Sequence, residues 1–169
     1  MRTIALGIVL LLGVVQGCAS VPDTPGPARD TTPKPMVPGR NTPQQLWLAV
    51  ASPTDANSNG YADTFQVIVY LFPDREISAI PVWADGRFDF VLQTPSGQVI
   101  NRWVFGNEAT RQSRQRLAPG PGHAFFLRLP EGLDVREPVV ASLRASFTPA
   151  NDAPQLTGNG DVSVRLGSR

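Results

Sequence analysis

Apolar and polar residues alternate with a period of two over most of the chain beyond residue 44. In five stretches every second side chain is apolar, namely 65–71, 88–92, 125–129, 143–147 and 162–166. A period of two directs one set of side chains into a core and the other set outward, as in a half-buried β-strand. With two further candidates at Gln45–Val50 and Val99–Phe105, the pattern predicts about seven strands.

Turn-forming residues separate these apolar stretches, at 58–60, 85–86, 95–97 and 119–122. Pro95-Ser96-Gly97 is short enough to close a hairpin between residues 87–94 and 98–105. Residues 109–117 are the best candidate for a short helical or irregular piece. We therefore expect an all-β, antiparallel β-sandwich, and its layout broadly resembles immunoglobulin-like and fibronectin-III-like domains. No particular sequence family is identified for this domain.

The N-terminus has the pattern of an export signal. Arg2 is followed by an apolar run over residues 4–15, which is shorter than the roughly 20 residues of a membrane-spanning helix. The run ends in Val15-Gln16-Gly17-Cys18, which resembles the lipobox of bacterial lipoproteins. The resemblance implies cleavage before Cys18, lipid attached to that cysteine and, because Ala19 follows it, sorting to the outer membrane.

An ordinary secretory signal with a chance cysteine is the alternative. Cys18 is the only cysteine in the chain, which counts against that alternative, because a stray thiol is a liability in an oxidising compartment. Acyl chains on Cys18 would hold the protein on a membrane of the cell envelope. Whether the domain then faces the periplasm or the cell surface is left open.

Three segments follow from this interpretation: a signal peptide over 1–17, a lipidated and Pro-rich tether over 18–44, and one β-sandwich domain over 45–169. The tether is too poor in large apolar side chains to fold, so we expect a partly polyproline-II spacer. A Pro-rich recognition motif is the alternative. Removal of Arg2 with the signal leaves 14 basic and 14 acidic side chains, and this balance argues against a nucleic-acid partner.

The stretch 55–63 resembles the calcium loops of EF-hand, dockerin and thrombospondin-type repeats. Oxygen-bearing side chains fall at alternate positions, Gly60 falls at the sharp turn, and the Tyr61 carbonyl adds a seventh-position ligand. The resemblance implies a structural Ca²⁺ site of weak affinity; its ligands would be Asp55, Asn57, Asn59, Tyr61 and Asp63. The alternative is an Asn- and Asp-rich turn without an ion.

Catalysis is disfavoured, and no catalytic residue is assigned. His123, the only histidine, follows a Pro-Gly turn and is expected at the surface, and one histidine cannot build a zinc site. Among carboxylates, Asp85, Asp89 and Glu108 are candidates for a glycosidase-like pair only by elimination. An envelope hydrolase is therefore the third choice of function.

Arginines and tryptophans supply the remaining candidates for binding. Residues 102 and 111–116 carry four arginines, which either form an anion-binding patch or pair with local acids. Trp47, Trp83 and Trp103 either form a sugar platform or fill the core, and Trp83 is the best candidate for exposure and ligand binding. The sequence thus favours a tethered, non-catalytic module that is structural or binds an envelope protein or glycan. A calcium-dependent carbohydrate-binding or adhesive module is the alternative.

Overall fold

A computed structural model describes residues 42–74, 79–151 and 153–167 of the chain. Nine strands and one short helix follow one another in these residues. Their bounds are β1 Gln45–Val50, β2 Thr64–Phe72, β3 Gly86–Gln93, β4 Val99–Phe105, α1 Asn107–Gln112, β5 Arg114–Leu117, β6 Gly120–Arg128, β7 Val139–Pro149, β8 Leu156–Thr157 and β9 Val162–Leu166. β1 and β4 have the bounds that the sequence pattern predicts.

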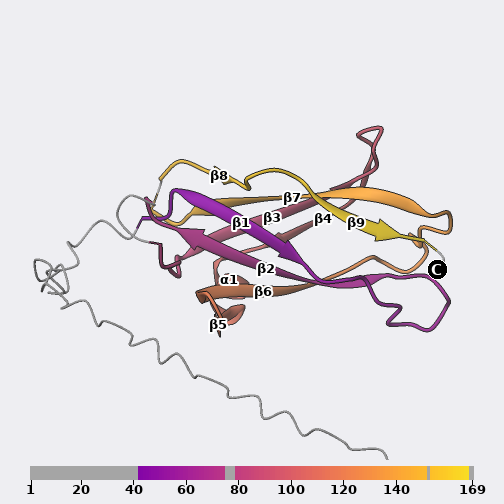
Figure 1. The fold of residues 1–169 in the computed structure, drawn as a ribbon, viewed down its shortest axis with the longest axis horizontal. Helices are drawn as coiled ribbons and strands as arrows, with labels where there is room; N and C mark the ends of the chain where they lie inside the picture. Colours follow the sequence, from indigo (N-terminus) through magenta and orange to yellow (C-terminus); the bar gives the residue numbers. More distant parts are fainter. Residues whose placement is uncertain (1–41, 75–78, 152, 168–169) are drawn as a thin grey trace, which may run out of the picture. The chain divides into compact units, whose positions relative to one another are not determined.

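The strands form two antiparallel sheets that face each other (Figure 1). Sheet A has the order β1-β2-β6-β5, and sheet B has the order β4-β3-β7, with β8 and β9 both paired to the free side of β7. The strands can be given the letters of the immunoglobulin fold in chain order: β1 is A, β2 is B, β3 is C, β4 is C′, β5 is D, β6 is E, β7 is F and β9 is G. Sheet A then has the order ABED and sheet B the order C′CFG, which is the immunoglobulin-type arrangement. The predicted all-β sandwich is confirmed.

The core lies between the inner faces of the two sheets and follows the predicted alternation. On β2 the odd-numbered residues 65–71 are buried, and on β3 Phe88, Phe90 and Leu92 are buried. Phe88 lies at the centre, with ring centroids 4.6 Å from Phe147 and 5.2 Å from Phe125. Aromatic rings from both sheets therefore interdigitate across the sandwich.

Two details differ from the sequence-based expectations. The stretch 109–117 divides into the end of α1 and the edge strand β5, because Leu117 pairs with Gly120 and closes a tight hairpin with β6. β5 and the two-residue β8 also raise the number of strands from about seven to nine. The hairpin predicted around Pro95-Ser96-Gly97 is present as the β3–β4 pair.

The signal peptide, Cys18 and the greater part of the tether lie outside the described residues, so their assignment stays a prediction. In the part of the chain that the structure describes, no helix is long and apolar enough to cross a membrane.

Candidate functional site

Aromatic side chains gather on the outer face of sheet A, at the end where β1 begins. Leu46 faces the core, so Trp47 faces outward, and on β2 Tyr70 and Phe72 alternate with buried residues in the same way. Trp47 is directly opposite Tyr70 in the β1–β2 register. The Phe72 ring lies edge-on to Trp47 at 5.7 Å and is tilted against Tyr70 at 6.4 Å.

Trp83 extends this group across the sheet. Val82 bridges Leu71 of β2, which places Trp83 beside Tyr70 on the outer face. The indole Nε1 of Trp83 donates to the Gly122 carbonyl at 3.0 Å. Gly122 is required there, because a Cβ would lie 2.9 Å from the Tyr70 ring. We call Trp47, Tyr70, Phe72 and Trp83 the aromatic strip.

The positively charged side chain of Arg116 contacts the aromatic strip. The Arg116 guanidinium of β5 lies 5.8 Å from the centre of the Trp83 ring, within the range of a cation–π contact. Farther along the same face Phe126 is 68 % exposed. Trp47 is 41 % exposed, whereas Trp83 and Trp103 are half-buried, so the expectation that Trp83 is the most exposed tryptophan is wrong. Trp83 contacts Arg116 through its ring and Gly122 through its indole N–H.

Tyr70 and Phe72 are members of this site that sequence reasoning missed. Their signal is present in the sequence, since Ile68, Tyr70 and Phe72 occupy outward positions of β2 that would normally be polar. Trp83 lies beside Tyr70 because Val82 bridges Leu71, and no local sequence pattern predicts that bridge.

The loop 55–63 connects β1 to β2 and satisfies most of its oxygens internally. The Asp55 carboxylate accepts the backbone N–H of Asn59 at 3.2 Å and that of Gly60 at 2.7 Å. Asn57 Oδ1 accepts the Asn59 N–H at 3.1 Å, and Asn59 Oδ1 accepts the Tyr61 N–H at 2.9 Å. These are Asx-type turns, and Gly60, at φ 90°, supplies the left-handed backbone that they need.

Asp63 anchors this loop to the sandwich and is buried. Its Oδ1 accepts the Ala56 N–H and the Thr64 hydroxyl, both at 2.9 Å, and its Oδ2 lies 3.6 Å from Arg128 Nε. Burial opposes ionisation of the carboxyl, but these hydrogen bonds and the Arg128 charge outweigh it and hold the pKa of Asp63 below its ordinary value. Asp63 is therefore an ionised side chain whose hydrogen bonds hold the two ends of the loop together.

The described residues contain no group of three or more His, Cys, Asp or Glu side chains arranged to hold a metal ion. A Ca²⁺ in the loop would have to compete with the backbone N–H groups that the same oxygens accept. Calcium binding by Asp55, Asn57, Asn59, Tyr61 and Asp63 stays a prediction.

The calcium-loop candidate and the aromatic strip lie at opposite ends of the β1–β2 hairpin. β1 starts at Gln45, opposite Phe72, and ends at Val50, opposite Val67, where the loop toward Asp55 begins (Figure 1). The structure thus brings Trp83 together with the other aromatic residues and not with 55–63.

The arginines at 102 and 111–114 are engaged by local acids. Arg111 and Arg114 both bind Asp85, at 2.9 Å and 2.6 Å, and Arg102 binds Asp89 at 2.7 Å. The hydrogen bond from Arg111, with the charges of both arginines, holds the pKa of Asp85 below its ordinary value. This arrangement is the local pairing that the sequence left open as the alternative to an anion-binding patch.

The other candidate carboxylates are also engaged. Burial disfavours ionised Asp89, but Arg87 and Arg102 donate to it and keep its pKa below the ordinary value. Glu108 accepts a hydrogen bond from Gln112 one helical turn later. Asp85 and Asp89, which their arginine partners hold as carboxylates, lack the proton that a general acid must deliver.

His123 is fully buried in β6, so the expectation of a surface histidine is wrong. The Pro-Gly sequence before it is part of the strand, and its ring lies 5.1 Å from Phe88 in the core. Nδ1 lies 3.0 Å from Ser113 Oγ and 3.2 Å from the Thr110 carbonyl, to which Ser113 also donates. This network assigns the proton to Nδ1.

Burial lowers the pKa of His123 to about 4. The hydrogen bond to the Thr110 carbonyl acts in the opposite direction, and the nearby charge of Arg114 lowers the pKa further. The imidazole is therefore neutral at pH 7. Ser113 and His123 resemble a nucleophile–base pair in distance only, because both side chains are buried away from any substrate. The pair joins α1 to β6 and acts as a structural element.

Comparison with protein-family models, with curated proteins and with solved structures gave no match. The class that the chain itself defines is a two-sheet β-sandwich with immunoglobulin-type strand order and an aromatic strip on one outer face.

Proposed function

We propose that the protein is a lipid-anchored lipoprotein of the bacterial cell envelope, in which the β-sandwich binds a protein partner and performs no catalysis. The N-terminal signal that ends at Cys18, with no other cysteine in the chain, supports the anchor. The neutral charge balance of the segment after residue 17 supports a partner other than nucleic acid.

The observation that carries the proposal is the aromatic strip with Arg116. Trp, Tyr and Arg are the residues that dominate the binding energy of protein interfaces. The Trp47–Phe72 contact and the Trp83–Gly122 hydrogen bond hold the rings in place before a partner arrives, which lowers the entropy cost of binding. Such a pre-organised, partly exposed group fits a docking surface.

The ring geometry favours a protein over a sugar as the partner. A run of sugar rings stacks best, through the C–H groups of one face, on aromatic rings that lie in one plane, whereas Trp47 and Phe72 are inclined by 65°. Arg116 lies over the Trp83 ring and would have to leave before a sugar could stack on that side. An uneven apolar surface with a cation at its rim suits protein side chains better.

Two further features support a non-catalytic role. Asp85 and Asp89 are held as carboxylates by arginines, and His123 is inside the core. The groups that sequence reasoning named as catalytic candidates are thereby used to stabilise the fold.

Site-specific photo-crosslinking in the envelope tests this proposal. We expect a crosslinker at Ala49, exposed on the outer face next to Trp47, to give one protein adduct that sediments with membranes. Trp47→Ala should lower the adduct yield about tenfold or more, as truncation of an interface hot spot does. Mass spectrometry of the mature N-terminal peptide should show that it begins at Cys18 and is acylated.

A crosslinker at Thr148, exposed on the outer face of sheet B, is the matched control and should give no such adduct. Equal yields from both faces, or a yield that Trp47→Ala leaves unchanged, would refute the role of the aromatic strip. A mature N-terminal peptide that is unacylated, or that begins elsewhere, would refute the anchor.

The calcium-dependent module is separated from this proposal by thermal unfolding in EDTA and in millimolar CaCl₂. A protein-binding domain should give the same Tm in both, because Asp55 and Asp63 already have hydrogen-bond donors. A higher Tm in CaCl₂, abolished by Asp55→Ala, would support the calcium-dependent module instead, since a ligand stabilises only the state that binds it. Asp134→Ala, at an acid that contacts Asn59 outside the loop, is the control.

A further inference from the structure

The edges of the two sheets meet on the side of the sandwich formed by β1 and β9. They are joined at one point, where Leu46 and Gly158 form a parallel bridge and the Asn159 N–H donates to the Leu46 carbonyl at 3.2 Å. Beyond that point no backbone hydrogen bond connects β1 with β9 in the described residues. The two edges therefore separate toward the end of the domain that carries the β1–β2 loop.

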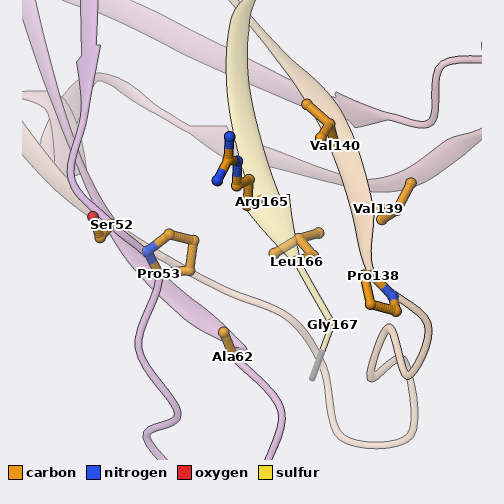
Figure 2. A pocket seen from close by; sticks show the side chains of 9 residues that line it. All are labelled: Ser52, Pro53, Ala62, Pro138, Val139, Val140, Arg165, Leu166 and Gly167. Atoms are coloured by element: carbon orange, nitrogen blue, oxygen red, sulfur yellow. The ribbon is translucent and has the colours of Figure 1, made fainter. Parts of the chain in front are cut away.

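A groove of about 540 Å³ opens between the separated edges. Its first wall is formed by Ser52, Pro53 and Ala62 of the β1–β2 connection, and its second wall by the ends of β7 and β9 (Figure 2). A second hollow of about 450 Å³ adjoins it, since both include Pro53, Ala62 and Gly167. The lining of the groove is mostly apolar.

The backbone of β9 faces this groove with unused hydrogen-bonding groups. β9 pairs with β7 on one side, through Val162 to Leu166. In a strand paired on one side, every second residue directs its N–H and C=O away from the partner. Within residues 42–74, 79–151 and 153–167 no other segment accepts or donates to those groups. β9 is thus an open edge onto which a further strand can add.

Arg165 supplies a charge at the same place. Its side chain is exposed and lines the groove. In the β7–β9 register Arg165 is directly opposite Val140. Among the described residues no acidic group forms an ion pair with it, whereas the neighbouring Arg144 binds Asp161 at 2.7 Å. A cation without an acidic partner, in an otherwise apolar groove, is complementary to a carboxylate.

We propose that this groove binds an extended segment of a partner protein, which adds to β9 as an extra strand of sheet B and places a carboxylate against Arg165. Backbone hydrogen bonds to β9 supply the affinity, as in other cases of strand addition. Small apolar side chains of the segment lie against Pro53, Ala62 and Leu166, and the acidic one gives the specificity. This site is separate from the aromatic strip and does not depend on it.

The test uses the chain without its lipid anchor, residues 19–169, and a capped hexapeptide of alternating threonine and valine with one central aspartate. NMR titration should shift the amide signals of Val162–Leu166, and the bound peptide should slow hydrogen exchange at alternate residues of β9. The aspartate peptide should bind about fivefold more tightly than a matched peptide with lysine in its place. Arg165→Glu, at an exposed position, should reverse that preference.

Three results would overturn the proposal. The first is the absence of shifts in β9 at millimolar peptide, or shifts at the opposite edge of sheet B, β4, in place of β9. The second is an aspartate preference that Arg165→Glu leaves unchanged. The third is a concentration-dependent shift of the same β9 amides without peptide, together with a dimer in sedimentation, which would assign the groove to a second copy. Trp47→Ala should leave peptide binding unaltered, so failure of this site and failure of the aromatic strip are distinguishable.

Discussion

Acidification from pH 6.5 to pH 4 should destabilise the folded domain by about 3 kcal/mol through His123 alone. The pKa of this buried imidazole falls from 6.5 in the unfolded chain to about 4 in the folded domain. The unfolded chain therefore binds more protons over this range, so the free energy of unfolding decreases as the pH falls. The contribution is complete above about pH 6.5 and is lost by about pH 4.

Urea unfolding at several pH values between 7 and 4, followed by tryptophan fluorescence, measures this effect. His123→Gln provides the control, because it keeps a polar group in place that does not titrate. His123 is the only histidine, and every acidic side chain is common to both proteins. The difference in pH slope between the two proteins thus isolates His123, and coincident slopes would show that the imidazole is not buried.

Phe88→Ala should cost about 3–5 kcal/mol of folding free energy, the range for truncation of a fully buried phenylalanine. Its ring contacts aromatic rings of both sheets, including Phe147 at 4.6 Å and His123 at 5.1 Å. These neighbours belong to strands paired in two separate sheets and cannot close together over the cavity. We expect this substitution to be the most damaging of those considered for the fold.

Phe126→Ala is the matched control, since it removes the same atoms from a side chain that is 68 % exposed. Its cost should stay within about 0.5 kcal/mol. Chemical denaturation of the two variants and the wild type gives both values from one type of experiment. Equal costs for the two variants would contradict the assignment of Phe88 to the core and Phe126 to the outer face.

The strands and their inner faces were predictable from the sequence because each rests on local information. Alternation along 65–71 and 88–92 depends only on neighbours two residues apart, and every predicted inward residue there is buried. The hairpin at Pro95-Ser96-Gly97 likewise depends on turn residues that are adjacent in the chain. The all-β class and the two-layer architecture follow from these patterns.

The candidate sites depended on contacts between residues far apart in the sequence. Trp83 joins Tyr70 through a bridge between Val82 and Leu71, and Asp85, just before β3, meets Arg111 of α1 and Arg114 of β5. No periodicity or motif encodes such pairings, so the arginines could be either a patch or ion pairs until the fold was known. The same limit applies to the groove beside β9, which exists only because two sheet edges separate.

His123 illustrates most clearly which features the sequence determines and which only the tertiary structure decides. A histidine after Pro-Gly-Pro-Gly predicts a surface turn, yet β6 already begins at Gly120, and the inward direction of the pleat places the imidazole against Phe88. The sequence by itself determined the strands, their inward faces and the lipobox-like N-terminus that ends at Cys18, since these are short-range patterns. Only the tertiary structure decided which side chains are buried as neutral groups, which charges are paired and which aromatic rings form the outer strip, because strand pairing brings together residues tens of positions apart.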